Sequence, residues 1–130
     1  MIPAIAVALV IRHGNKYILR PVLPDNRRSF PRGVLKPYET LRAAGERVAL
    51  EQAGVRVQVT QSLYTQETID EQNFTHEVVL YLGCTYVGGL LDEVKLPGVQ
   101  WVSNTMLKSF RPGVLTDAAQ DAVRAIIGVD

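Results

Sequence analysis

Residues 33–55 read GVLKPYETLRAAGERVALEQAGV, a glycine-led loop that runs into a short helical stretch. Thr40 is a suitable N-cap, and Gly54 is a suitable C-cap because glycine adopts left-handed backbone angles at low cost. Gly45 weakens the prediction, since a glycine inside a helix costs about 1 kcal/mol relative to alanine. Apolar residues between the caps recur at helical spacing, at Leu41, Ala44 and Val48. The stretch therefore predicts a loop followed by a helix that begins near Thr40 and ends before Gly54.

The last turns of this helix determine what chemistry it supports. Residues at i, i+3 and i+4 share one helical face, and Val48, Glu51 and Gln52 form such a set. Three carboxylates at this spacing would form a site for Mg²⁺, which prefers oxygen ligands, but only Glu51 is a carboxylate. Glu39 and Arg47 are two helical turns apart, and Arg47 precedes Glu51 by four residues, so the spacing predicts an ion-pair network from loop to helix.

The same segment resembles the Nudix box, G-x(5)-E-x(7)-R-E-U-x-E-E-x-G-U, where U is aliphatic. The register runs without a gap from Gly33 through Glu39, Arg47, Glu51 and Gly54 to Val55. A signature of this length is far more specific than a lone glycine motif. The resemblance implies an α/β protein with an α-β-α sandwich and a mixed central β-sheet. It also implies a hydrolase of a nucleoside diphosphate linked to another moiety, with Mg²⁺ or Mn²⁺ as cofactor.

The resemblance assigns roles to particular residues. It implies that Glu51 is catalytic and that Glu51 and the backbone carbonyl of Gly33 are metal ligands. It also implies a structural role for four residues, one of which is again Gly33. These are Gly33, Glu39, Arg47 and Gly54.

Two residues depart from the pattern where the family places metal-binding carboxylates. Val48 has no donor atom, and the amide of Gln52 binds Mg²⁺ more weakly than an anion would. Loss of a partner that only supports a metal ligand costs ~10–100-fold in affinity, so loss of two ligands should cost at least as much. We therefore expect weak metal binding, or none without substrate. A slow or atypical hydrolase is one hypothesis, and a non-catalytic module that binds a nucleotide or a protein partner is the alternative.

A basic loop precedes the box. Phe30-Pro31-Arg32-Gly33 is similar to the Pro-Lys-Gly sequence of Nudix members that act on dinucleoside polyphosphates, and guanidinium groups suit bidentate phosphate contact. A solvated surface loop is the alternative interpretation. The candidate substrate-binding residues are Arg27, Arg28, Arg32 and Lys36.

Other polar residues lie in or beside loops that could approach the cleft. The carboxylates among them are Glu67, Asp70, Glu71, Glu77, Asp92 and Glu93. Each is expected to be an exposed surface charge, because Asp and Glu are mostly exposed. His76 is expected to be structural rather than a base. Tyr64 and Tyr81 either stack on a base or fill the core.

Composition limits the possible partners. With 130 residues, 47% hydrophobic, the chain suits one domain over residues 1–130. The net charge of +1 provides no field for nucleic-acid or membrane attraction, so a nucleotide-type small molecule is the expected ligand. The lone Cys84 cannot form an internal disulfide, which fits the cytoplasm. The opening MIPAIAVALVI is too short to span a bilayer and is expected to be a buried strand. A homodimer is expected because dimers are frequent in the family.

The rest of the chain predicts mainly strands. Gly14-Asn15 suits the turn of an N-terminal hairpin, and LPDNRRSFPRG (residues 23–33) is expected to be a loop. Later strands are predicted at VRVQVT, FTHEVVLYLGCTYV and GVQWVS, and a C-terminal amphipathic helix at TDAAQDAVRAIIG. The expected total is two helices and five to seven strands, with helices on both faces of the sheet.

Overall fold

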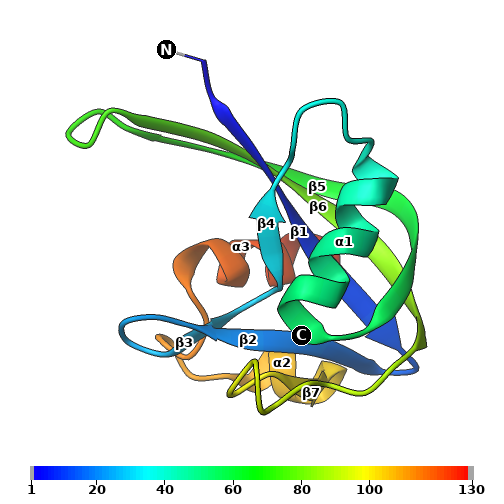
Figure 1. The fold of residues 1–130 in the computed structure, drawn as a ribbon. Helices are drawn as coiled ribbons and strands as arrows, with labels where there is room; N and C mark the ends of the chain where they lie inside the picture. Colours follow the sequence, from blue (N-terminus) through cyan, green and yellow to red (C-terminus); the bar gives the residue numbers. More distant parts are fainter. Residues whose placement is uncertain (1, 129–130) are drawn as a thin grey trace.

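The computed structural model describes residues 2–128, which form seven strands, one long helix and two shorter ones. The strands pair in the order β3-β2-β1-β6-β5, while β4 pairs with β1 and β7 with β2. Strands β1 and β6 are parallel and the other pairs are antiparallel, so the predicted mixed sheet is confirmed (Figure 1). The element bounds are β1 Ala4–His13, β2 Lys16–Val22, β3 Arg27–Ser29, β4 Arg32–Val34, α1 Leu41–Ala53, β5 Arg56–Asp70, β6 Thr75–Gly88, β7 Gln100–Ser103, α2 Asn104–Ser109 and α3 Asp117–Ile126.

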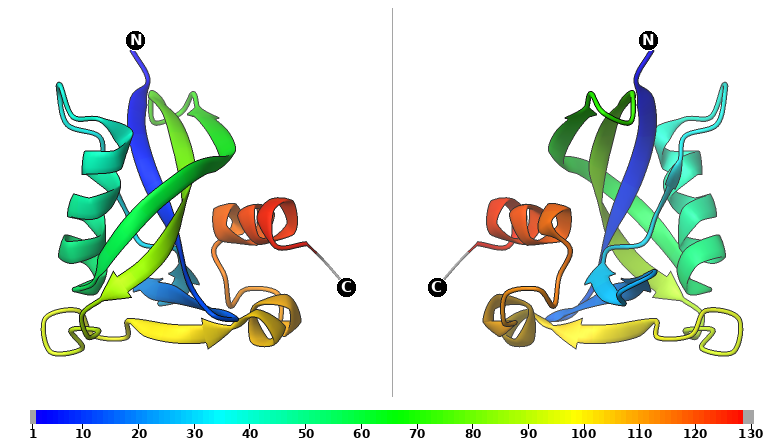
Figure 2. Two further views of the ribbon diagram at one scale, coloured as in Figure 1. Left: turned by 90° about the vertical axis from the view of Figure 1, so that its right-hand side faces the viewer. Right: turned by 90° about the vertical axis from the view of Figure 1, so that its left-hand side faces the viewer.

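Helices α1 and α3 cover opposite faces of the sheet (Figure 2). Strand β1 is buried on both sides, because successive side chains of a strand point to opposite faces. Val7 and Leu9 of β1 pack in the core under α1, while Ala6 and Ala8 pack in the core under α3. The expected α-β-α sandwich is therefore confirmed. Within residues 2–128, no helix is long and apolar enough to cross a membrane.

The predicted caps of α1 are confirmed. The Thr40 hydroxyl accepts a hydrogen bond from the Ala43 amide at 3.1 Å, which satisfies one of the free donors of the first turn. Gly54 ends the helix with φ at 75°, in the left-handed region where glycine avoids a steric cost. The N-terminal hairpin is also confirmed, since Arg12 pairs with Tyr17 across the Gly14-Asn15 turn.

Three features of the secondary structure differ from expectation. The segment 23–33 was expected to be a loop, but it contains β3 and the start of β4, which pair with β2 and β1. Their pairing partners are distant in sequence, so local turn residues gave no signal for them. The short helix α2 was not expected either, although the Ser103 hydroxyl caps it by accepting from the Met106 amide. Strand β5 extends further than the predicted VRVQVT, to Asp70, while β6 covers nearly the predicted residues. Together they form a long hairpin that projects from the body of the molecule (Figure 1).

Gly45 allows α1 to approach the sheet closely. A Cβ atom at this position would lie 2.5 Å from Cγ2 of Val59 and 3.5 Å from Cδ1 of Leu82. The first distance is far below van der Waals contact, so the glycine is required by packing although it weakens the helix.

We predict that Gly45→Ala destabilises the protein by about 1–3 kcal/mol, the usual range for overpacking a core, although alanine favours a helix. Urea unfolding of Gly45→Ala, Val59→Ala and the double variant measures the coupling between the two positions. Because Val59→Ala removes the clashing methyl group, the double variant should be more stable than the sum of the single effects indicates. Additive effects would show that the contact does not limit the packing of α1.

Candidate functional site

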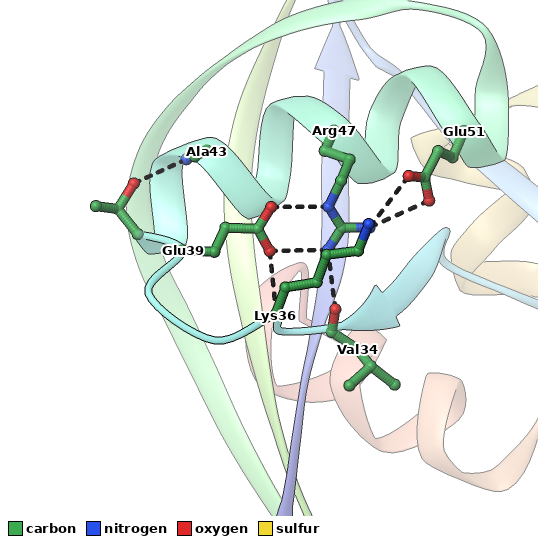
Figure 3. Close-up of polar contacts among 7 residues, drawn as sticks. Val34, Lys36, Glu39, Ala43, Arg47 and Glu51 are labelled. Carbon is green, nitrogen blue, oxygen red and sulfur yellow. Dashed lines mark hydrogen bonds and ion pairs between the residues drawn. The ribbon is translucent and has the colours of Figure 1, made fainter.

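One guanidinium group joins the loop before α1 to the helix. Arg47 Nε donates to Glu39 Oε2 at 2.8 Å, and Nη2 donates to Glu39 Oε1 and to the Val34 carbonyl, both at 2.9 Å (Figure 3). Glu39 Oε1 also accepts from the backbone amide of Lys36 at 3.1 Å. The ion pair predicted between Glu39 and Arg47 is therefore present, and it fixes the loop over the first three turns of the helix.

The surroundings of this pair keep it charged. Hydrogen bonds from Arg47 lower the pKa of Glu39 to about 2. The same contact raises the pKa of Arg47 above its usual value. The two side chains are 13% and 20% exposed, so water screens their attraction less than at an open surface.

Glu51 belongs to the same network. Nη1 of Arg47 donates to its two carboxylate oxygens at 3.1 and 3.3 Å, and the Glu51 side chain is 49% exposed (Figure 3). The carboxylate that the resemblance assigns to metal binding and catalysis therefore already has a cationic partner. A metal ion at Glu51 would have to compete with Arg47 or bind beside it.

Val48 lies beneath β4 rather than in an open site. Its side chain is fully buried, and a Cβ atom at Gly33 would lie only 2.8 Å from Val48 Cγ2. Gly33 thus lets β4 pass directly over the helix. Val48, Glu51 and Gln52 were expected to share one helical face; in the structure the first is buried in the core, whereas the second is half exposed beside Arg47.

Gln52 has a partner that sequence reasoning missed. Its Oε1 accepts a hydrogen bond from Nη1 of Arg20, in strand β2. Ile18, two residues earlier, is fully buried in the core under α1, and strand alternation places Arg20 on the same face. The alternation indicates from the sequence which face of β2 carries Arg20, while its partner on α1 is known only from the assembled sheet and helix.

The acidic side chains do not assemble into a metal site. Among residues 2–128, no group of three or more His, Cys, Asp or Glu side chains is placed to hold a metal ion. Glu77 pairs with Arg32 at 2.6 Å, and Asp70 accepts from Asn73 within its own turn. Asp92 accepts from the Lys95 amide. Glu51 and Gly33 therefore lack the second carboxylate that a Mg²⁺ or Mn²⁺ site would need, and the residues present do not fit such an ion.

The four candidate phosphate-binding residues each contact different parts of the protein. Arg27 pairs with Asp25 at 2.9 Å and with Asp117 at 3.5 Å, and Arg32 pairs with Glu77. The backbone of Arg28 bonds to Val114 and Thr116, while Lys36 meets Glu39 through its amide. Arg27 and Arg32 therefore carry neutralising partners, and a substrate-binding role for these four residues stays a prediction.

The remaining candidate residues are paired with other side chains or buried in the core. His76 Nε2 lies 2.7 Å from Glu67 Oε2. Tyr81 is buried, donates to Gln66 Oε1, and has its pKa raised to about 12 by burial. Burial also raises the pKa of Cys84 to about 12, so its thiol is a buried hydrophobe as expected.

Comparison with known proteins supports the fold. No family model matches the sequence, and no curated protein matches it. Many solved structures share the fold. A NUDIX hydrolase from Nitrosomonas europaea is 21% identical with a TM-score of 0.76, over 95% of this chain and 87% of that chain. A MutT NUDIX hydrolase from Burkholderia pseudomallei is 18% identical with a TM-score of 0.77, over 96% and 98% of the two chains.

A third solved structure is described by its activity. An ADP-ribose pyrophosphatase from Streptococcus suis is 16% identical with a TM-score of 0.67, over 92% of this chain and 88% of that chain. At these identities the similarity establishes the fold alone. The predicted resemblance in fold is thus confirmed: residues 2–128 adopt the fold of these proteins.

We predict that acid lowers the stability of the folded protein by protonating Glu39. The pKa of this carboxyl is about 2 in the folded protein against 4.5 ordinarily, so its contribution to stability is complete above about pH 4.5 and is lost as pH falls toward 2. Thermal unfolding from pH 6 to pH 2 should show a smaller acid-induced fall in Tm for Glu39→Gln than for the wild type. Glu46→Gln, at an exposed position of the same helix, should follow the wild type. Parallel curves for Glu39→Gln and the wild type would contradict the linkage.

A second prediction concerns metal. Because Glu51 is the only carboxylate among Val48, Glu51 and Gln52, millimolar Mg²⁺ or Mn²⁺ without ligand should leave the Tm unchanged relative to EDTA. Differential scanning calorimetry across a metal titration checks this expectation. A rise in Tm that disappears in Glu51→Gln would show that a loop carboxylate has joined Glu51 at a real site.

Proposed function

We propose that this chain, whose fold is that of the Nudix hydrolases, binds nucleoside diphosphates linked to another moiety without hydrolysing them. The proposal rests on which side chains of α1 are present and which of them are already paired. Its framework contacts are complete, whereas only Glu51 of the three metal-binding positions keeps a carboxylate, and Arg47 already holds it. The fold supports binding, while the site supplies little for catalysis.

Hydrolysis of a diphosphate places strict demands on the site. Water attacks one phosphorus atom, and the charge on the bridging and non-bridging oxygens must be neutralised as the bond breaks. Arg47 cannot neutralise it freely, because Glu39 and Glu51 occupy its donors. His76, the histidine that was considered as a base, is paired with Glu67 on the β5–β6 hairpin. The pairing of Arg47 in α1 and of His76 in β6 thus favours retention of the ligand over cleavage.

A hydrolase remains the competing candidate, because the framework residues match the Nudix box and the neighbours in fold are described as hydrolases. It requires one of the loop carboxylates to move beside Glu51 when substrate binds. One neighbour is described as an ADP-ribose pyrophosphatase, which makes ADP-ribose a reasonable first ligand to test.

Two further expectations accompany the proposal. A reducing compartment, the cytoplasm, suits a chain whose single Cys84 is buried and unpaired. A homodimer is also proposed, and analytical ultracentrifugation measures it directly.

We predict that ADP-ribose stabilises the protein without being consumed. Ligand at 100 times its Kd raises the free energy of unfolding by about 2.7 kcal/mol, because it binds only the folded state. With Mg²⁺ present, chromatography should recover the ligand intact over hours. Glu51→Gln should show the same ligand-induced rise in Tm as the wild type. If the wild type instead cleaves ADP-ribose into two phosphomonoesters in Mg²⁺ and Glu51→Gln does not, the chain is a hydrolase and the proposal is wrong.

A further inference from the structure

Arg20 places a positive charge against the metal-binding face of α1. It lies in β2, opposite Ser29 of β3, and its side chain crosses to Gln52 near the end of the helix. Gln52 stands at one of the positions where the Nudix box has a carboxylate. A guanidinium group of the protein therefore contacts the side chain at that position.

The guanidinium of Arg20 is incompletely satisfied. Nη1 donates to Gln52, but Nε is buried and has no hydrogen-bond partner. Nε is therefore shielded from solvent and makes no hydrogen bond within the described residues. None of the ion pairs found within residues 2–128 includes Arg20, so its charge is not neutralised by a described carboxylate. Arg20 differs in this respect from Arg27, Arg32 and Arg47, all of which have acidic partners.

The residues around Arg20 preserve its charge. Gln52 accepts a hydrogen bond and orients the guanidinium, yet its neutral amide leaves the positive charge available. A glutamate at the same position would form an ion pair and cancel most of it. Val48, the other altered position, is apolar and buried, so it adds no negative charge to this face. The two departures from the Nudix box thus remove the anions that would attract a metal and would neutralise Arg20.

We propose that Arg20 is a fixed replacement for the divalent cation, so that the diphosphate group of the ligand binds beside Gln52 without any metal. This inference rests on the proposed function and specifies which charge holds the ligand. With Nη1 engaged by Gln52 and Nε buried, Nη2 is the nitrogen of the guanidinium that remains for an oxygen of a phosphate group.

Calorimetric titration of ADP-ribose and of inorganic pyrophosphate in EDTA tests the proposal. The wild type should bind both, and Arg20→Gln should weaken both about 10- to 100-fold, the effect of losing a charge-assisted hydrogen bond. Arg124→Gln removes the same charge from an exposed position of α3, on the opposite face of the sheet, and should bind as the wild type does. Arg20→Lys keeps the charge but loses the planar guanidinium that Gln52 orients, so it should fall between the wild type and Arg20→Gln.

Gln52→Glu provides a second variant that keeps the guanidinium. Its new carboxylate should pair with Arg20, so anion affinity should fall while the Tm stays the same or rises. If Arg20→Gln does not fold, Gln52→Glu alone tests the role of Arg20.

The outcomes separate the two proposals. Wild-type affinity in both Arg20→Gln and Gln52→Glu would overturn the role of Arg20 and leave the proposed function in place. Binding by the wild type only when Mg²⁺ is added would overturn the replacement of the metal. Absence of binding by the wild type in either condition would contradict both proposals.

Discussion

The contact between Arg47 and Glu39 is the constraint on which the rest of the site depends. One guanidinium bonds to a loop carboxylate, to the carbonyl of Val34 in β4, and to Glu51 one turn further along α1. These bonds hold β4 against the helix, where Gly33 and Val48 approach so closely that no side chain fits at residue 33. The network therefore orders the loop and the helix at once, and it also occupies the single carboxylate available for a metal.

The site keeps the framework residues of the Nudix box but has fewer carboxylates at the positions where that pattern places metal ligands. A cluster of three carboxylates would be strongly anionic and would need a metal ion before it could accept a phosphate group. In this chain Val48 is neutral and buried, Gln52 is neutral, and Arg20 points at Gln52. The same face of α1 is thus suited to an anion directly. This difference explains how the framework residues can be complete in a chain whose metal-binding residues are not.

The sequence predicted those parts of the fold that depend on local physical chemistry. Thr40 and Gly54 define α1 because a hydroxyl N-cap and a left-handed glycine act within one turn, and the Glu39–Arg47 pair follows from helical spacing. Strands β3 and β4 escaped prediction because their partners lie in β1 and β2, and three residues carry too little pattern to be recognised. The contact of Arg20 with Gln52 spans 32 residues, so it needs the assembled sheet and helix. The loop carboxylates could not be placed for the same reason.

The central claim is that a protein cation, rather than a metal ion, meets the diphosphate. A crystal structure of the protein grown with ADP-ribose and millimolar Mg²⁺ tests it most directly. Our account predicts diphosphate oxygens within hydrogen-bonding distance, about 2.7–2.9 Å, of the Arg20 guanidinium, with Glu51 still paired to Arg47. An octahedral Mg²⁺ ion that bridges Glu51 and the diphosphate, with Arg20 turned away from the ligand, would contradict it.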